Sequence, residues 1–118
     1  MEPGPAQEPP AAPAPEAREA TGSVVGLASF YGRRFNGRRT ASGEPYDAHR
    51  LTCAHPTAPF GTRLRVTDLE TGRSVVVTVN DRGPFVRGRV VDVSLAAARA
   101  LGMVARGVAR VRVERLPD

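Results

Sequence analysis

Asp81 stands where a carboxyl group is well placed for general acid–base chemistry. It follows the apolar run Ser74–Val79 and precedes Gly83 and Pro84, so the sequence places it at a strand end where the chain turns outward. Groups that take part in chemistry concentrate in such positions on a rigid scaffold. An Asx-type turn uses the same residue, and from the residues alone this structural role is the simpler interpretation.

Two further acids and one histidine have the same two interpretations. Glu44 and Asp47 form an E-x-x-D pair in the loop SGEPYD, where Pro45 keeps Glu44 out of helical geometry. A solvated loop with Asp47 as a helix N-cap explains this pair, more readily for Asp47 than for Glu44. His55 follows an apolar run and precedes Pro56, and a lone histidine is more often structural than catalytic. Residue types alone therefore leave both roles open.

Short strands have to position these groups. Alternating or β-branched runs predict strands at residues 23–32, 52–55, 63–68, 74–79, 89–94 and 109–116. One helix is expected at residues 94–102, with Ser94 as its N-cap and Gly102 at its end. A helical turn is the other expected element, at Asp47–Leu51. Such a set favours an all-β fold that closes into a small barrel, because open strand edges need protection.

The first 22 residues differ from the rest in composition. They are rich in Pro, Ala and Glu and have almost no large apolar side chain, so we expect a disordered linker at residues 1–22 and a folded domain at residues 23–118. The net charge of +5 divides into −3 for the linker (four Glu, one Arg) and +8 for the domain (sixteen Arg, eight acids). A basic domain suits a polyanionic partner, such as nucleic acid, an anionic membrane or an anionic cell-wall polymer.

Several classes of function find no support in the sequence. Cys53 is the only cysteine, so no internal disulfide is expected, and the two histidines do not complete a metal-ligand spacing. GRRFNG lacks the context of a phosphate-binding loop, and no cofactor is implied. No stretch is long and apolar enough to cross a membrane, and no secretory signal is visible.

Four segments carry a resemblance to a known family. They occur in order with short gaps: GLASFYG, FNGRRTASGEPYD, TCAHPTAPFGTRLRVTDLETGRSVVVTVNDRGPF and GRVVDVSLAAARALG. From about Val25 to Val113 the chain resembles the double-psi β-barrel domain of the rare lipoprotein A family, the septal-ring lytic transglycosylases. The resemblance implies a six-stranded barrel with one or two short helices and an open groove. Phe30 departs from the family, which commonly has tryptophan there, and Cys53 replaces a small residue such as alanine.

The resemblance also implies an activity on peptidoglycan. Such enzymes cleave the bond between N-acetylmuramic acid and N-acetylglucosamine, prefer strands stripped of their stem peptides, and leave 1,6-anhydro ends. The sugar's own 6-hydroxyl attacks in place of water, so one carboxyl group can serve first as acid and then as base. The match places Asp81 in that role, with Glu44 lining the groove and His55 orienting Asp81 or binding a sugar.

Substrate contacts are expected from further residues. Strand alternation sends Phe30 and Tyr31 to opposite faces, and Tyr31, with its hydroxyl, suits a wet site better. Arg82 and Arg39 are expected to meet lactyl, phosphate or carboxylate groups. Asp92 either lines the groove from the other side or is a buried, hydrogen-bonded group. The expected substrate-binding set is Tyr31, Asp47, Arg82 and Asp92.

Three other functions differ from the transglycosylase in the residues that they need. A non-catalytic module of the expansin type would use the same groove to bind peptidoglycan or another polysaccharide, but it would need none of Glu44, His55 and Asp81. A hydrolase would need two carboxyl groups about 5–5.5 Å or 6.5–9.5 Å apart. A nucleic-acid binder would need clustered Arg with interleaved aromatics, so no nucleic-acid partner is expected. The family implies an exported protein, periplasmic or associated with the outer membrane, with a possible lipid anchor upstream, and a monomer is the default expectation.

Overall fold

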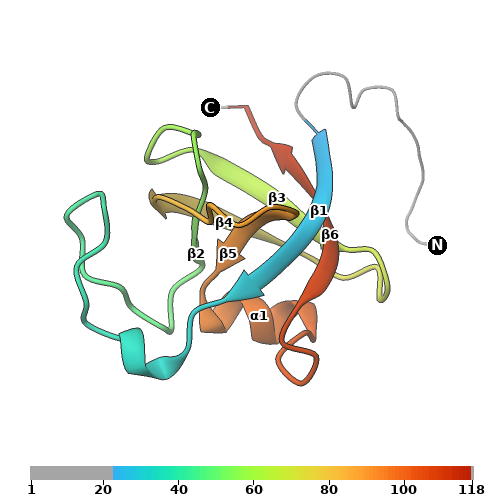
Figure 1. Ribbon diagram of the computed structural model, residues 1–118, viewed down its shortest axis with the longest axis horizontal. Helices are drawn as coiled ribbons and strands as arrows, with labels where there is room; N and C mark the ends of the chain where they lie inside the picture. Colours follow the sequence, from blue (N-terminus) through green and yellow to red (C-terminus); the bar gives the residue numbers. More distant parts are fainter. Residues whose placement is uncertain (1–22, 118) are drawn as a thin grey trace.

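Six strands close into a barrel in the order β1-β5-β2-β4-β3-β6 (Figure 1). The structure is a computed structural model that describes residues 23–117, so the linker predicted for residues 1–22 lies outside the described residues. The closed barrel confirms the predicted all-β fold. Its elements are β1 (Ser23–Phe30), the short 3-10 helix η2 (Arg33–Phe35), β2 (Thr52–Ala54), β3 (Arg63–Asp68), β4 (Ser74–Asp81), β5 (Arg89–Val93), α1 (Leu95–Leu101) and β6 (Ala109–Arg115).

Two parallel pairs are embedded in this barrel. β1 runs parallel to β5 and β2 runs parallel to β4, whereas the remaining neighbours are antiparallel. Parallel neighbours need long crossover connections. Residues 31–88 connect β1 to β5, and residues 55–73 connect β2 to β4. The register aligns Ser29 with Asp92, Asp92 with Ala54, and Ala54 with Asp81. Polar residues from three strands therefore share one line across the barrel wall.

The barrel interior is filled by alternate apolar residues, as the strand patterns predict. Its largest fully buried apolar side chains are Leu64, Val66, Val77, Val79, Val91, Val93, Leu101, Met103 and Val111. Cys53 is also buried, and burial raises the pKa of its thiol to about 12, so it packs as a small neutral side chain. Within the described residues, no helix is long and apolar enough to cross a membrane.

The helix α1 covers one end of the barrel (Figure 1). As predicted, Ser94 is its N-cap, and its hydroxyl accepts a hydrogen bond from the N–H of Ala97 at 3.3 Å. Gly102 ends it in the left-handed conformation, with φ of 73°. Residues 47–51 contain the expected turn, which does not extend into a helix. There the Asp47 carboxylate accepts the N–H of His49 at 2.9 Å and its carbonyl accepts that of Arg50 at 3.1 Å.

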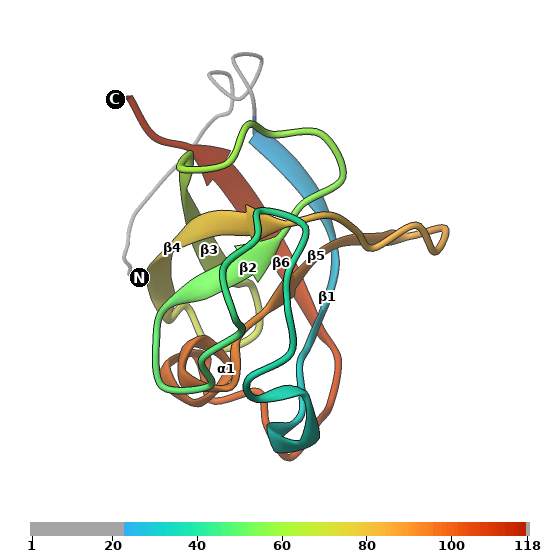
Figure 2. The ribbon, with the colours of Figure 1, turned by 90° about the vertical axis from the view of Figure 1, so that its left-hand side faces the viewer.

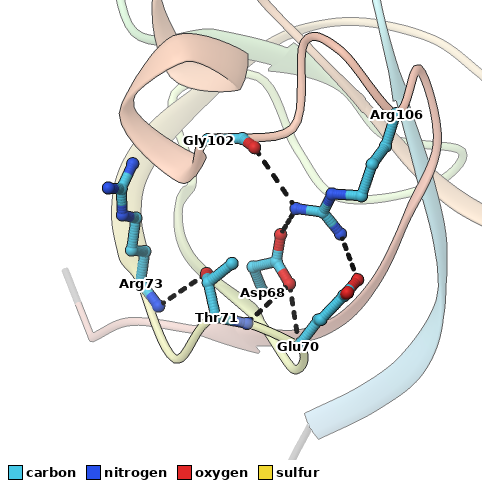
Figure 3. A network of polar contacts seen from close by, with 6 residues as sticks. All are labelled: Asp68, Glu70, Thr71, Arg73, Gly102 and Arg106. Atoms are coloured by element: carbon cyan, nitrogen blue, oxygen red, sulfur yellow. Dashed lines mark hydrogen bonds and ion pairs between the residues drawn. The ribbon is translucent and has the colours of Figure 1, made fainter.

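A buried aspartate ties the β3–β4 turn to the segment after α1 (Figure 3). Asp68 is fully buried, and one carboxylate oxygen accepts the backbone N–H groups of Glu70 at 2.8 Å and Thr71 at 3.2 Å. Its other oxygen pairs with Arg106, which also reaches the Glu70 carboxylate at 2.9 Å. This network holds two chain segments that are distant in the sequence at the same end of the barrel as α1.

Candidate active site

Asp81 ends β4, and three donors from separate parts of the chain hold its carboxylate. One oxygen accepts the backbone N–H of Ala41 at 2.8 Å and that of Arg82 at 2.9 Å. The other accepts the hydroxyl of Tyr31 at 2.5 Å. Asp81 remains partly exposed. Its carboxylate is thus fixed in direction while still reachable from solvent, which is the geometry that proton exchange with a bound molecule requires.

The Ala41 donor comes from a small arm, residues 37–46, which folds back across the barrel (Figure 2). Paired backbone hydrogen bonds hold the arm together: Gly37 N–H to the Tyr46 carbonyl at 2.7 Å, and Thr40 N–H to the Glu44 carbonyl at 2.8 Å. The N–H of Ser42 then donates to the Asn80 carbonyl at 3.2 Å. These bonds seat the arm's tip against the end of β4, which is why Ala41 reaches Asp81.

Glu44 approaches the site through Asn80. The Asn80 amide donates to the Glu44 carboxylate at 3.2 Å, and Asn80 is buried directly before Asp81 in the chain. The structure therefore ties Glu44 to the residue before Asp81, and the two carboxylates share no hydrogen-bonding partner. Asn80 was not among the residues singled out from the sequence, and its only sequence signal is its position next to Asp81.

Tyr31 belongs to an aromatic group under the arm. Its ring stacks on Tyr46 with centroids 4.7 Å apart and meets Phe35 edge-on at 5.9 Å. Burial, and next the hydrogen bond to Asp81, raise the pKa of Tyr31 well above its ordinary value of 10.0. The phenol therefore keeps its proton and acts as a donor to Asp81. Phe30, its neighbour, packs against both the barrel core and the cluster that contains Tyr46.

His55 contacts Asp81 through the backbone. Its N–H donates to the Asp81 carbonyl at 3.1 Å, while its imidazole Nδ1 accepts the N–H groups of Thr57 and Ala58 at 3.1 and 3.0 Å. Burial, and next the charges of Arg115 and Arg82, lower the pKa of His55 below 6.5. The ring is thus neutral near pH 7 and shapes the loop that follows β2.

Arg82 fastens that same loop. Its Nη1 donates to the carbonyls of His55 at 3.2 Å and Ala58 at 2.8 Å, and its guanidinium lies 4.3 Å from the Phe60 ring centroid. The guanidinium of Arg82 therefore makes its contacts within the protein. Arg39 donates to the Gly43 carbonyl at 3.0 Å within the arm.

The remaining predicted residues lie apart from the Asp81 carboxylate. Asp92 is hydrogen-bonded to the Ser29 hydroxyl and pairs with Arg89 at 2.7 Å, in the same row as Asp81 but with Ala54 between them. Asp47 is exposed and caps its own turn.

Two cavities of about 440 Å³ each lie elsewhere on the barrel, and neither is lined by Asp81, Glu44 or Tyr31. Among residues 23–117, no three His, Cys, Asp or Glu side chains gather as metal ligands.

Similar proteins agree with this architecture. A family model described as lytic transglycolase matches residues 23–113. Probable endolytic peptidoglycan transglycosylase RlpA of Nostoc sp. is 60% identical over 94 residues, covering 78% of this chain and 25% of that protein. Endolytic peptidoglycan transglycosylase RlpA of Pasteurella multocida is 51% identical over 98 residues, covering 82% of this chain and 33% of that protein. The chain thus spans a third or less of these relatives.

Solved structures show the same fold. The Streptomyces papain inhibitor superposes with a TM-score of 0.65 at 26% identity, covering 80% of this chain and 94% of the inhibitor. An expansin of Clavibacter michiganensis gives a TM-score of 0.65 at 27% identity, covering 81% of this chain and 51% of the expansin. With the family match over most of its length, the chain belongs to the rare lipoprotein A family of lytic transglycolases, whose domain is a double-psi β-barrel.

Proposed function

We propose that this domain is a peptidoglycan lytic transglycosylase with Asp81 as its acid and base. The observation that carries the proposal is the partly exposed Asp81 carboxylate, held by Tyr31 and two backbone N–H groups. Relatives that are 48–60% identical are named endolytic peptidoglycan transglycosylases, some of them as probable. The substrate would be glycan strands, with a preference for strands that lack stem peptides.

One carboxyl group suffices for this reaction. Protonated Asp81 gives its proton to the glycosidic oxygen as the bond to C1 of N-acetylmuramic acid breaks. The 6-hydroxyl of the same sugar then attacks C1, and its proton passes to the Asp81 carboxylate. The product is a 1,6-anhydro end, no water is consumed, and the carboxyl group returns to its starting state.

Neighbouring residues support these steps in different ways. Tyr31 orients the Asp81 carboxylate as a neutral donor, and Glu44 accepts a hydrogen bond from Asn80, the residue before Asp81. Phe85 lies on the loop after Asp81, which extends from the barrel in Figure 2, and is 78% exposed, so its ring offers a face for a sugar. His55 and Arg82 act as positioning residues, because their contacts shape the loop beside Asp81.

A binding module is the second candidate. The observation in its favour is the structural likeness to an expansin mutant solved in complex with cellohexaose, with a TM-score of 0.65 at 26% identity. That expansin has the same fold and was solved with cellohexaose bound. A domain of this kind would hold a glycan strand without cleaving it.

Peptidoglycan as substrate also implies a place of action. The domain would work in the cell envelope, outside the cytoplasm, where the glycan strands lie. An exported protein, periplasmic or held at the outer membrane by a lipid anchor upstream and acting as a monomer, fits this proposal.

Mass spectrometry of peptidoglycan digests tests the proposal. Purified peptidoglycan, with and without stem peptides, is incubated with the protein and the soluble products are analysed. Products with 1,6-anhydro ends, more abundant from stripped strands, are expected. Reducing ends would indicate a hydrolase, and no soluble product from protein that still sediments with the polymer would favour the binding module.

A further inference from the structure

A second site lies at the end of the barrel opposite α1. A cavity of about 440 Å³ opens there, a size typical of small-molecule sites. It is lined by residues from the start of β1 and β5, the end of β6, the start of β3 and the loop after β2, which meet at the upper end of the barrel in Figure 2. Neither the Asp81 carboxylate nor the arm contributes to it.

The walls of this cavity are apolar. Leu64 and Val113, which face the barrel core, form part of its lining and are almost fully buried. Val24 and Val90 complete the apolar part, and Val24 is 49% exposed at the mouth. A small aliphatic group placed against these side chains would remove apolar surface from water, which is favourable.

Two residues with N–H donors, Arg89 and His55, also line this cavity. Arg89 pairs with Asp92 through Nη2, its side chain is 31% exposed, and its buried Nε has no hydrogen-bond partner. A bound carboxylate would therefore meet the accessible part of this side chain and not Nε. His55 accepts two N–H groups at Nδ1, which leaves the proton of the neutral ring on Nε2 as a further donor.

The charge of the cavity favours a monoanion. Asp92 neutralises Arg89, whereas the Arg115 side chain forms no ion pair or hydrogen bond within residues 23–117. His55 adds no charge near pH 7. One positive charge therefore remains at the mouth, beside apolar walls.

We propose that this cavity binds a small aliphatic carboxylate, with Arg115 and Arg89 receiving the carboxylate and Val24, Val90 and Val113 receiving the aliphatic part. The proposal is independent of the function proposed for Asp81. Both a free short-chain acid and the C-terminal alanine of a peptide have this chemistry, since each joins a carboxylate to a small aliphatic group.

Amide chemical shifts in a ¹⁵N-labelled full chain test the proposal. The probes are hexanoate, N-acetyl-D-alanyl-D-alanine and hexan-1-ol, which has the aliphatic body without the charge. Saturable shifts are expected around Val24, Val90 and Val113 with at least one carboxylate probe, and hexan-1-ol should bind about tenfold more weakly or worse. The tighter of the two carboxylates identifies the source, a free acid or a peptide end.

Two variants distinguish binding in this cavity from nonspecific attraction of an anion to a basic protein. Arg115→Gln should weaken binding of the better carboxylate roughly tenfold, because one charge-assisted contact is lost. Arg112→Gln is the control, since Arg112 is exposed on the same strand and does not line the cavity. Equal weakening by both variants, equal binding of hexan-1-ol, or the absence of saturable shifts at Val24, Val90 and Val113 would overturn the proposal.

Discussion

The Asp81 carboxylate receives one of its three hydrogen bonds from a side chain, and that side chain has a close structural counterpart. Tyr31 donates to Asp81 at 2.5 Å, whereas Tyr46, stacked on it, accepts the N–H of Leu95 at 3.0 Å and does not contact Asp81. The two tyrosines pack in the same aromatic cluster, but their hydroxyl groups form hydrogen bonds with different partners. Removing each hydroxyl separately therefore distinguishes positioning of Asp81 from packing.

Tyr31→Phe should lower the rate of peptidoglycan cleavage by roughly 10- to 100-fold, because Asp81 loses a charge-assisted hydrogen bond that fixes its direction. The ring stays in place, so the thermal midpoint should change little. Tyr46→Phe should instead lower stability and leave the rate per folded molecule close to wild type. Initial rates on stripped peptidoglycan and thermal unfolding measure both effects. Equal rate losses in the two variants would contradict a positioning role for Tyr31.

His55 should make stability depend on pH. Burial, and next the charges of Arg115 and Arg82, lower its pKa in the folded state below the unfolded value of about 6.5. The unfolded chain then binds the proton first, so stability is full above pH 6.5 and falls as the pH drops through the folded-state pKa. Urea denaturation between pH 7.5 and 5 should show a shallower slope for His55→Asn than for wild type. Parallel slopes would show that His55 is not responsible.

At the scale of elements, the approach of β1 to β5 depends on a glycine. A Cβ added at Gly26 would lie 2.5 Å from Val90 Cγ1 and 3.2 Å from the Gly88 carbonyl oxygen. At Gly32 an added Cβ meets nothing within 4 Å, and its φ of −81° is ordinary for any residue. Gly26 lies within β1 and Gly32 just after it, and the two positions differ in the space that surrounds them.

Gly26→Ala should lower the free energy of unfolding by about 1–3 kcal/mol, because β1 or Val90 has to shift to admit the methyl group. Gly32→Ala should stay within about 0.5 kcal/mol of wild type. Urea denaturation of both variants provides the comparison. A loss in Gly32→Ala as large as that in Gly26→Ala would show that close packing of β1 on β5 is not the cause.

Most elements were predictable because their signals are local. Alternating apolar residues in β3 and β6 and the run of valines in β4 indicate strands, and Ser94 and Gly102 mark the ends of α1. The turn expected at residues 47–51 is present but does not extend into a helix. Its backbone hydrogen bond ends at Arg50, and β2 begins at Thr52.

The candidate site was predictable only in part. Asp81 was singled out by its place at a strand end and by the family resemblance, and Tyr31 by strand alternation. Their hydrogen bond, however, spans fifty residues and depends on how the barrel closes. The N–H of Ala41 has no side-chain signature, and the pairing of Asn80 with Glu44 depends on the docked arm. No sequence pattern indicated that the His55 Nδ1 would be occupied by backbone donors.

For the molecule as a whole, Asp68 and Arg106 connect the β3–β4 turn to the segment that leads into β6. Arg106 contacts two acids that differ in burial, because Asp68 is fully buried and the Glu70 side chain is 71% exposed. Asp68 also accepts two backbone N–H groups, which Glu70 does not.

Asp68→Ala should lower the free energy of unfolding by about 3 kcal/mol, because two N–H groups and Arg106 lose their buried acceptor. Glu70→Ala should cost less than about 1 kcal/mol, as expected for an exposed ion pair. Chemical denaturation gives both values. Similar losses in the two variants would show that burial of the acceptor does not decide the contribution.

The most direct test of the account compares wild type with Asp81→Asn on stripped peptidoglycan. The variant keeps the size of the side chain and cannot act as acid and base, so it should sediment with the polymer as wild type does and release no 1,6-anhydro products. Its thermal midpoint, measured alongside, confirms that the variant is folded. Undiminished 1,6-anhydro product from a folded Asp81→Asn protein would contradict the account and place the acid elsewhere.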